Sequence, residues 1–301
     1  MKVLIAGGSG FLGRYIGRAL LDRGHQVTVL SRNPARVGPI AQLTGADAVA
    51  GDVTRPETLD GLLEGFECVV GAAQLPNYPV EVPRKGLTFD AYDRHGTENL
   101  LAEARRAGVR RFVYISGAGA DPRSDKTWYR AKGRAEGAVR ASGLAWAILR
   151  PSWAYGPEDK SLNKFVTIAR FSPVVPRIGL HDQRIQPVFV GDVAAAVGEV
   201  AGRDDTWERD YEIGGPETLT MDEVIRTMLE TLGKRRLVVP VPKALAKLGV
   251  APLVLLPKPP MTPGGIEFAA QDGLVDDSEL RKTLGVTPID LRTGLRRYLR
   301  G

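Results

Sequence analysis

The sequence has few of the residues on which disulfides and metal sites depend. It contains one cysteine, Cys68, and three histidines, His25, His95 and His181, which lie far apart. A single cysteine excludes an internal disulfide, and its place in an apolar run predicts a small core residue in a reducing compartment. No spacing of potential ligands indicates a metal site.

Long runs of one residue type are also absent. No apolar run reaches the ~20 residues that a membrane-spanning helix needs, and the chain enters its first apolar run without a charged leader. The net charge of +6 is spread over scattered pairs such as Arg105-Arg106 and Arg296-Arg297, so we expect no nucleic-acid partner. The sequence therefore predicts a cytoplasmic globular protein of one or two domains.

The most informative stretch is the first thirteen residues, MKVLIAGGSGFLG. An apolar run over 3–6 predicts a buried strand, and apolar residues recur at helical spacing over 14–21. Between a strand and a helix, Gly7 allows a tight turn, Gly10 lets a pyrophosphate approach the backbone, and Gly13 lets the helix pack closely. The helix N-terminus would then face the phosphates. This context predicts dinucleotide binding, with the spacing G-x-x-G-x-x-G.

The stretch after the second expected strand, 26–30, indicates which dinucleotide is bound. An acidic residue about 20 positions past the glycine loop holds the ribose hydroxyls in NAD-binding folds. Here that stretch has no Asp or Glu and contains Arg32 and Arg36, which suit a 2′-phosphate. We therefore expect NADP(H) to be favoured over NAD(H), the alternative being that both arginines are surface charges. Asp52, after the strand expected at 46–50, is placed to accept from an adenine amino group.

Strands alternate with helices from residue 1 to about 150. Such alternation predicts an α/β fold with a doubly wound parallel sheet and right-handed crossovers. The further elements expected are helices at 56–65 (with Thr54 as a possible cap), 89–107 and 128–142, and strands at 68–73, 111–116 and 145–151. A smaller, proline-rich region follows, in which Thr220 and Glu223 form a capping box for a helix at 221–232.

These elements predict a domain organisation. We expect residues 1–155 to form a Rossmann-type NAD(P)-binding domain, to which 187–215 returns. The remaining residues, 156–186 and 216–301, would form a smaller substrate or cap region.

Taken in order, the motifs resemble those of atypical, extended short-chain dehydrogenases/reductases. The motifs are the GGSGFLG loop, Asp52, Ala72-Ala73, Leu149-Arg150-Pro151, Gly156-Pro157, Val190-Gly191-Asp192-Val193-Ala194 and Tyr211-Glu212-Ile213-Gly214-Gly215. The resemblance spans nearly the whole chain and is nearest to the NAD(P)H-binding accessory subunit of respiratory complex I and its bacterial, epimerase/dehydratase-like relatives. It implies cofactor contacts from Gly7, Gly10, Phe11, Leu12, Gly13, Asp52, Val53, Ala72, Ala73 and Pro151.

The resemblance also shows where the chemistry departs from the family. Catalytic members carry Tyr-x-x-x-Lys, in which the lysine lowers the tyrosine pKa so that the phenol can exchange a proton with the substrate. Here Trp128 takes the tyrosine position, and Tyr129 stands three residues before Lys132. Tyr129 can share a helix face with Lys132, but it points about 100° away from the usual direction. Ser116, at the end of the fifth expected strand, would add a hydroxyl.

Two hypotheses follow. In the first, the protein is a reductase that transfers a hydride to an unknown carbonyl, quinone or nucleotide-sugar-type substrate. Lys132 would hold the nicotinamide ribose, Tyr129 would act as a displaced general acid, and Ser116 would orient the substrate. In the second, the protein binds NADP(H) without turnover, as a sensor or as an accessory or assembly subunit of a respiratory complex, and Lys132 is only a ribose ligand.

One uncharged segment, Leu248–Pro257, also leaves two alternatives. It packs within the cap, or it docks on a partner or a membrane surface. The second alternative would place the protein at the inner face of a membrane.

Overall fold

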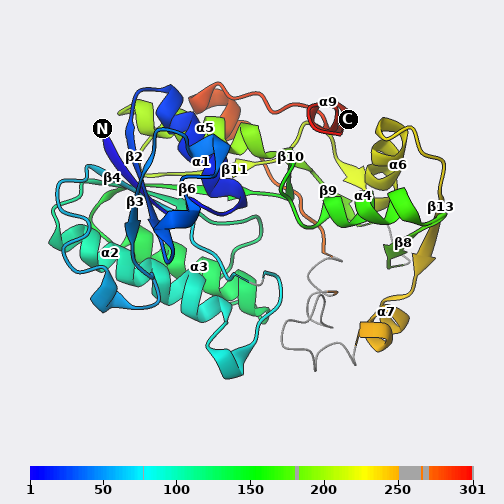
Figure 1. Ribbon diagram of the computed structural model, residues 1–301, viewed down its shortest axis with the longest axis horizontal. Helices are drawn as coiled ribbons and strands as arrows, with labels where there is room; N and C mark the ends of the chain where they lie inside the picture. The colour runs from blue at the N-terminus through cyan, green and yellow to red at the C-terminus, as the bar shows by residue number, and fades with distance from the viewer. Residues whose placement is uncertain (77, 180–182, 251–265, 267–270, 300–301) are drawn as a thin grey trace.

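The computed structural model describes residues 1–76, 78–179, 183–250, 266 and 271–299. Its centre is a seven-stranded parallel sheet with the order β11-β6-β5-β4-β1-β2-β3 (Figure 1). The strands are β1 (Lys2–Ala6), β2 (Gln26–Ser31), β3 (Asp47–Ala50), β4 (Cys68–Gly71), β5 (Arg111–Ile115), β6 (Ala145–Pro151) and β11 (Arg209–Ile213).

Helices cover both faces of this sheet (Figure 1). One core cluster joins one face to α1 (Phe11–Asp22) and α5 (Val190–Gly202). A second cluster joins the other face to α2 (Gly96–Arg106), which continues from the π-helical turn η5 (Asp90–His95), and to α3 (Thr127–Arg140). The predicted doubly wound α/β fold is confirmed.

The apolar run that predicts the first strand is buried on both sides. Val3 and Ile5 belong to the core cluster under α1 and α5, whereas Leu4 and Ala6 belong to the cluster under α2 and α3. All four side chains are inaccessible to solvent. A continuous apolar run is expected of a strand in a parallel sheet, because helices cover both of its faces.

A smaller region lies beside the central sheet (Figure 1) and has its own core cluster around Val166, Met228 and Leu295. The predicted capping box at Thr220 and Glu223 is confirmed at the start of α6. The elements of this region are the helices α4 (Leu162–Phe171), α6 (Met221–Thr231), α7 (Lys243–Val250) and α9 (Leu291–Arg296), the turn η7 (Leu280–Leu284), and the strand pairs β7 (Ala154–Tyr155) with β10 (Val188–Phe189), β9 (Arg184–Ile185) with β12 (Leu219–Thr220), and β8 (Val174–Ile178) with β13 (Leu237–Val241).

The helix predicted at 56–65 is wrong. The chain forms a single 3₁₀ turn, Pro56–Thr58, and continues in turns to residue 65. Gly61 and Gly65 adopt φ of +76° and +77°, a left-handed conformation that an α-helix cannot contain. Thr54 does not cap this turn, since its N–H and hydroxyl both donate to Asp52 Oδ1.

Two of the sequence-based expectations concern membranes and metals. Within the described part of the chain, no helix is long and apolar enough to cross a bilayer, and no cluster of His, Cys, Asp and Glu could hold a metal ion. Of the segment Leu248–Pro257, only the first three residues fall in the described part, at the end of α7. The two alternatives for that segment therefore concern mainly residues 251–257, which lie outside the described residues.

Candidate functional site

The strand order places a topological switch point at the carboxyl edge of the central sheet, between β1 and β4. From β1 the chain runs through β2 and β3 on one side, and it then returns to build β4, β5, β6 and β11 on the other side. Ligands bind at such a switch point in open α/β sheets, between the first loops on either side. Here these loops begin at Gly7 after β1 and at Ala72 after β4.

Three close approaches explain the glycines of the first loop. Gly7 has a φ of +84°, and a Cβ on it would lie 2.5 Å from the carbonyl oxygen of Ala72. A Cβ on Gly13 would overlap the carbonyl oxygen of Gly7, which shows how closely α1 packs on the loop. Gly10 donates its N–H to Gly7 at 2.9 Å and then starts the helix. The loop therefore turns tightly between β1 and Ala72-Ala73.

Helix α1 begins without a side-chain cap or an acidic residue in its first turn. The side chains of Phe11 and Leu12 pack in the core of the smaller region, so the first turn presents its backbone to the loop. Arg14 Nε and Nη2 donate to the carbonyls of Gly10 and Ser9 at 3.2 and 3.1 Å. Uncapped N–H groups and a nearby guanidinium form an environment that suits phosphate.

The loops after β2 and β3 carry the residues expected at the adenosine end. Arg32 is exposed, and its Nη1 lies 3.3 Å from the hydroxyl of Tyr92, on η5. Arg36 is also exposed, in the 3₁₀ turn Pro34–Arg36. Asp52 uses one carboxylate oxygen for Thr54, and Val53 is buried with its carbonyl bound by Asn99 Nδ2 at 2.8 Å.

The ammonium of Lys132 is enclosed between α3, η5 and β5. Its Nζ lies 3.0 Å from Asp93 Oδ1 and donates to the carbonyl of Ile115 at 2.8 Å. The exposed fractions of the two side chains are 4% and 0%. Burial by itself would lower the pKa of Lys132, but Tyr114 and Asp93 together outweigh it and raise that pKa. Lys132 therefore keeps its proton as one half of a buried ion pair.

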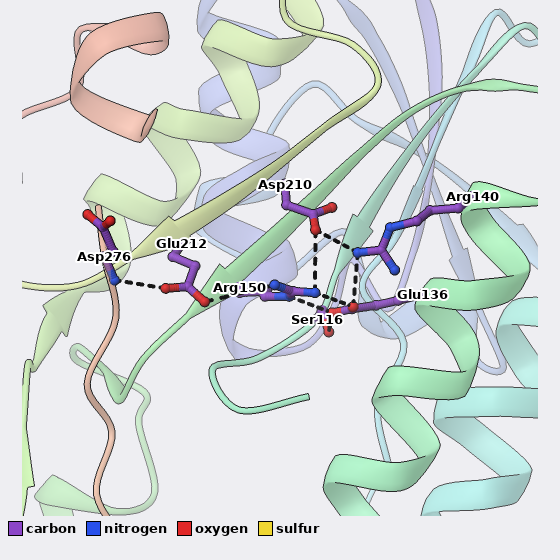
Figure 2. Close-up of polar contacts among 7 residues, drawn as sticks. All are labelled: Ser116, Glu136, Arg140, Arg150, Asp210, Glu212 and Asp276. Carbon is purple, nitrogen blue, oxygen red and sulfur yellow. Dashed lines mark hydrogen bonds and ion pairs between the residues drawn. The ribbon is translucent and has the colours of Figure 1, made fainter. Parts of the chain in front are cut away.

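The hydroxyl of Ser116 is used within a second polar cluster, which Figure 2 shows. It donates to Glu136 Oε1 at 2.6 Å. Arg150 donates to both oxygens of the same carboxylate, from Nε at 2.8 Å and from Nη2 at 2.5 Å. Asp210 on β11 continues the cluster, 3.4 Å from Arg150. The cluster links α3 to β6 and β11 through hydrogen bonds and ion pairs, and the Ser116 hydroxyl takes part in this structural network.

Trp128 and Tyr129 pack against the loop that follows β5. The Trp128 ring lies against Gly117, and a Cβ on Gly119 would lie 2.7 Å from Tyr129 Cε1. The two rings meet edge to face with centroids 4.8 Å apart. Burial raises the pKa of the Tyr129 phenol. Lys132, one helical turn along, points to Asp93, so it does not supply the charge that lowers a catalytic tyrosine pKa.

Pro151 completes the set of predicted residues. It is the last residue of β6, it is buried, and its carbonyl accepts from Ala118 N–H at 3.0 Å. It therefore lies at the same edge of the sheet as the glycine loop, beside the loop that carries Gly117 and Gly119.

Sequence reasoning missed Glu158, Asp93 and Glu136. Glu158 accepts from Tyr15 at 2.7 Å and from Gln42 at 3.1 Å, and it forms an ion pair with Arg14 at 3.4 Å. It joins the smaller region to α1 beside the glycine loop. Glu158 and Asp93 lie far in sequence from Arg14 and Lys132, with which they pair, and Glu136 has a sequence neighbour, Arg140, in its cluster but lies 14 and 20 positions from Arg150 and Ser116. A local pattern could therefore have indicated only the Glu136–Arg140 pair.

Comparisons with known proteins bear on this site. A family model described as NAD(P)H-binding matches residues 7–174. The 40 kDa subunit of mitochondrial NADH-ubiquinone oxidoreductase from Neurospora crassa is 27% identical over 301 residues, which cover 98% of this chain and 78% of that protein. Ceramide reductase from Caulobacter vibrioides is 33% identical over 195 residues, which cover 64% of this chain and 58% of that protein. UDP-glucose 4-epimerase from Thermotoga maritima shares the fold, with a TM-score of 0.77 at 20% identity, covering 99% and 97% of the two chains.

Proposed function

The chain belongs to the NAD(P)H-binding family, and from that premise we propose that it holds NADP(H) at the switch point between β1 and β4 without oxidising or reducing it. The resemblance predicted from the motifs is thereby confirmed at the level of the family. Gly7, Gly10 and the first turn of α1 would bind the pyrophosphate. Asp52, Val53 and Ala72-Ala73 would line the adenosine and ribose positions, and Pro151 would lie near the nicotinamide.

The enclosure of Lys132 carries the proposal that the cofactor is not turned over. Reduction of a carbonyl needs a proton donor beside the hydride acceptor, and in this family a lysine tunes a tyrosine for that role. Here Lys132 is paired with Asp93, Trp128 takes the place of the tyrosine, and Ser116 is bound to Glu136. The name of the Neurospora relative, a respiratory-complex subunit, supports an accessory or assembly role beside such a partner.

The choice of NADP(H) over NAD(H) rests on the loop after β2. A 2′-phosphate needs cationic donors, and Arg32 and Arg36 both extend from this loop into solvent. The ribose hydroxyls of NAD(H) would need a carboxylate there, and 31–40 contains none.

A binding and turnover experiment tests the proposal. We expect NADPH to bind more tightly than NADH in a titration of nicotinamide fluorescence. We also expect the nicotinamide absorbance of the bound NADPH to stay constant when quinones, aldehydes or ketones are added. Tighter binding of NADH would contradict the cofactor preference, and steady oxidation at a rate proportional to protein would contradict the absence of turnover.

Tyr129 supports a second candidate function, that of a reductase. Its ring lies on the loop that follows β5, at the same edge of the sheet as the glycine loop, and burial keeps its phenol protonated. Tyr129→Phe would then abolish the oxidation of NADPH, whereas the same substitution leaves cofactor binding unchanged. Because the raised pKa lies above the ordinary value of about 10, the rate would stay flat from neutral pH to about pH 9.5. If the rate instead fell as the pH was raised from 7 to 9, a group other than Tyr129 would be the proton donor.

A further inference from the structure

The end of the molecule formed by α4, β8, β13 and α7 has an unusual composition. Residues 160–178 contain four basic residues and 232–250 contain five, and neither segment contains Asp or Glu. The two segments lie together, because β8 pairs with β13 and Arg236 Nε donates to the carbonyl of Ala169 at 2.8 Å. We call these two segments the basic end; they lie farthest from β2 and β3 in Figure 1.

Large apolar side chains project from the basic end into solvent. Phe171, the last residue of α4, is 87% exposed, and Leu237, the first residue of β13, is 65% exposed. Val174 lies opposite Leu237 in the strand pair and is 37% exposed. Leu245 and Leu248 of α7 are 60% and 71% exposed. Scattered exposed apolar residues are ordinary, but a concentration of them at one end marks an interaction surface.

Several exposed cations of the basic end form no ion pair with the residues that the structure describes. Within the described residues, no ion pair forms at any of five exposed basic side chains: Lys160, Lys164, Arg170, Lys234 and Arg235. Other arginines of the described residues are paired with carboxylates, as Arg140 and Arg150 are in the cluster around Glu136. The acidic residues of the neighbouring helix α6 are used locally, since Asp222 pairs with Arg226, and Glu230 pairs with Arg292.

We propose that the basic end docks on an anionic lipid bilayer. Phe171, Val174 and Leu237 would enter the interface, and the surrounding lysines and arginines would contact headgroup phosphates. The apolar side chains project from a strand pair and a helix end, which suits a soft interface that they can penetrate. The long stems of Lys and Arg lie along apolar surface while their charges reach the phosphates.

Flotation with vesicles tests this proposal. We expect the protein to float with vesicles of phosphatidylcholine mixed with phosphatidylglycerol at low salt, and to bind pure phosphatidylcholine weakly. Each basic residue near an anionic surface contributes about fivefold in affinity. The double variant Lys234→Gln/Arg235→Gln should therefore bind about 25-fold more weakly. The double variant Phe171→Ser/Leu237→Ser should lose the apolar part of the binding, which is the part that persists in the unaltered protein at high salt.

A matched control separates this surface from general charge. Arg105, in α2, and Arg110, just before β5, are exposed and lie outside the basic end, so Arg105→Gln/Arg110→Gln removes the same charge and should bind vesicles as the unaltered protein does. An equal loss of vesicle affinity in this control would overturn the proposal. Failure of the unaltered protein to float would also overturn it, and that result is expected if the surface binds another protein. Urea unfolding checks that each variant is folded. The vesicle result is independent of the cofactor proposal, which NADPH titration tests separately.

Discussion

At the scale of single residues, Arg32 has the clearest role to test. It stands where NAD-binding folds place a carboxylate, and its guanidinium contacts the hydroxyl of Tyr92 at 3.3 Å and the ring of the same residue. A hydrogen bond to a charged group contributes about 1.5–3 kcal/mol. Arg32→Ala should therefore weaken NADPH binding by about ten- to a hundredfold and leave NADH binding nearly unchanged, as measured by fluorescence titration.

The control for this prediction is Arg105→Ala, which removes an exposed arginine distant from the loop. It should leave the affinity for both dinucleotides within about twofold, because an exposed charge beyond the screening length contributes little. If Arg32→Ala weakened NADH and NADPH equally, Arg32 would act through the general positive potential, and the 2′-phosphate assignment would fail.

Single residues also show what a sequence alone can predict about the site. The conformations of Gly7 and Gly13 follow from local chemistry, because only glycine fits a strand-to-helix turn this tight. The environment of Lys132 does not follow from local chemistry. Its partner Asp93 lies on a different helix, and only the packing of α3 on η5 brings the two together.

At the scale of elements, the cluster around Glu136 holds α3 against the sheet edge. Glu136 is 2% exposed and accepts from Ser116 and Arg150. Removing one partner of a buried ion pair costs about 3 kcal/mol, and Arg150 would keep the more distant carboxylates of Asp210 at 3.4 Å and Glu212 at 3.9 Å. We expect Glu136→Gln to lower the free energy of unfolding by about that amount in urea titrations.

The exposed part of the same cluster provides the comparison. Arg140 is 37% exposed, and it contacts Glu136 at 3.3 Å and Asp210 at 2.6 Å. Pairs near solvent contribute less than about 1 kcal/mol, so Arg140→Gln should have a small effect. Similar losses for Glu136→Gln and Arg140→Gln would show that Glu136 is not the centre of the cluster.

Elements with a strong periodic pattern were predicted well, and the others were not. Strands β1, β4 and β5 coincide with apolar runs because inner parallel strands are buried on both faces, whereas the edge strand β3 is mostly exposed. The helix predicted at 56–65 failed because two glycines there take left-handed conformations. The pair β8 and β13 was missed, since its strands contain proline and pair across the whole of α5 and α6. No local pattern encodes such a distant partner.

At the scale of the whole molecule, the proposed cofactor site and the basic end lie in different regions that meet at α1. The glycine loop follows β1, an inner strand of the parallel sheet, whereas α4 and β8 lie outside that sheet, in the smaller region (Figure 1). Glu158 precedes α4 and contacts Arg14 and Tyr15 of the helix that starts at the glycine loop. Burial and Glu158 raise the pKa of Tyr15, so its phenol stays protonated and donates to Glu158 at this junction.

The contacts of Glu158 with Arg14 and Tyr15 offer a route by which the two regions would be coupled. If bound dinucleotide changes the position of the segment that carries Glu158, it changes the affinity of anything that binds beyond that segment, and the reverse change must be equal. A bilayer that bound the loaded protein five times more tightly would then retain the dinucleotide five times more tightly. Through one carboxylate, the concentration of a soluble dinucleotide and the occupancy of a membrane surface would then be linked in a single binding equilibrium.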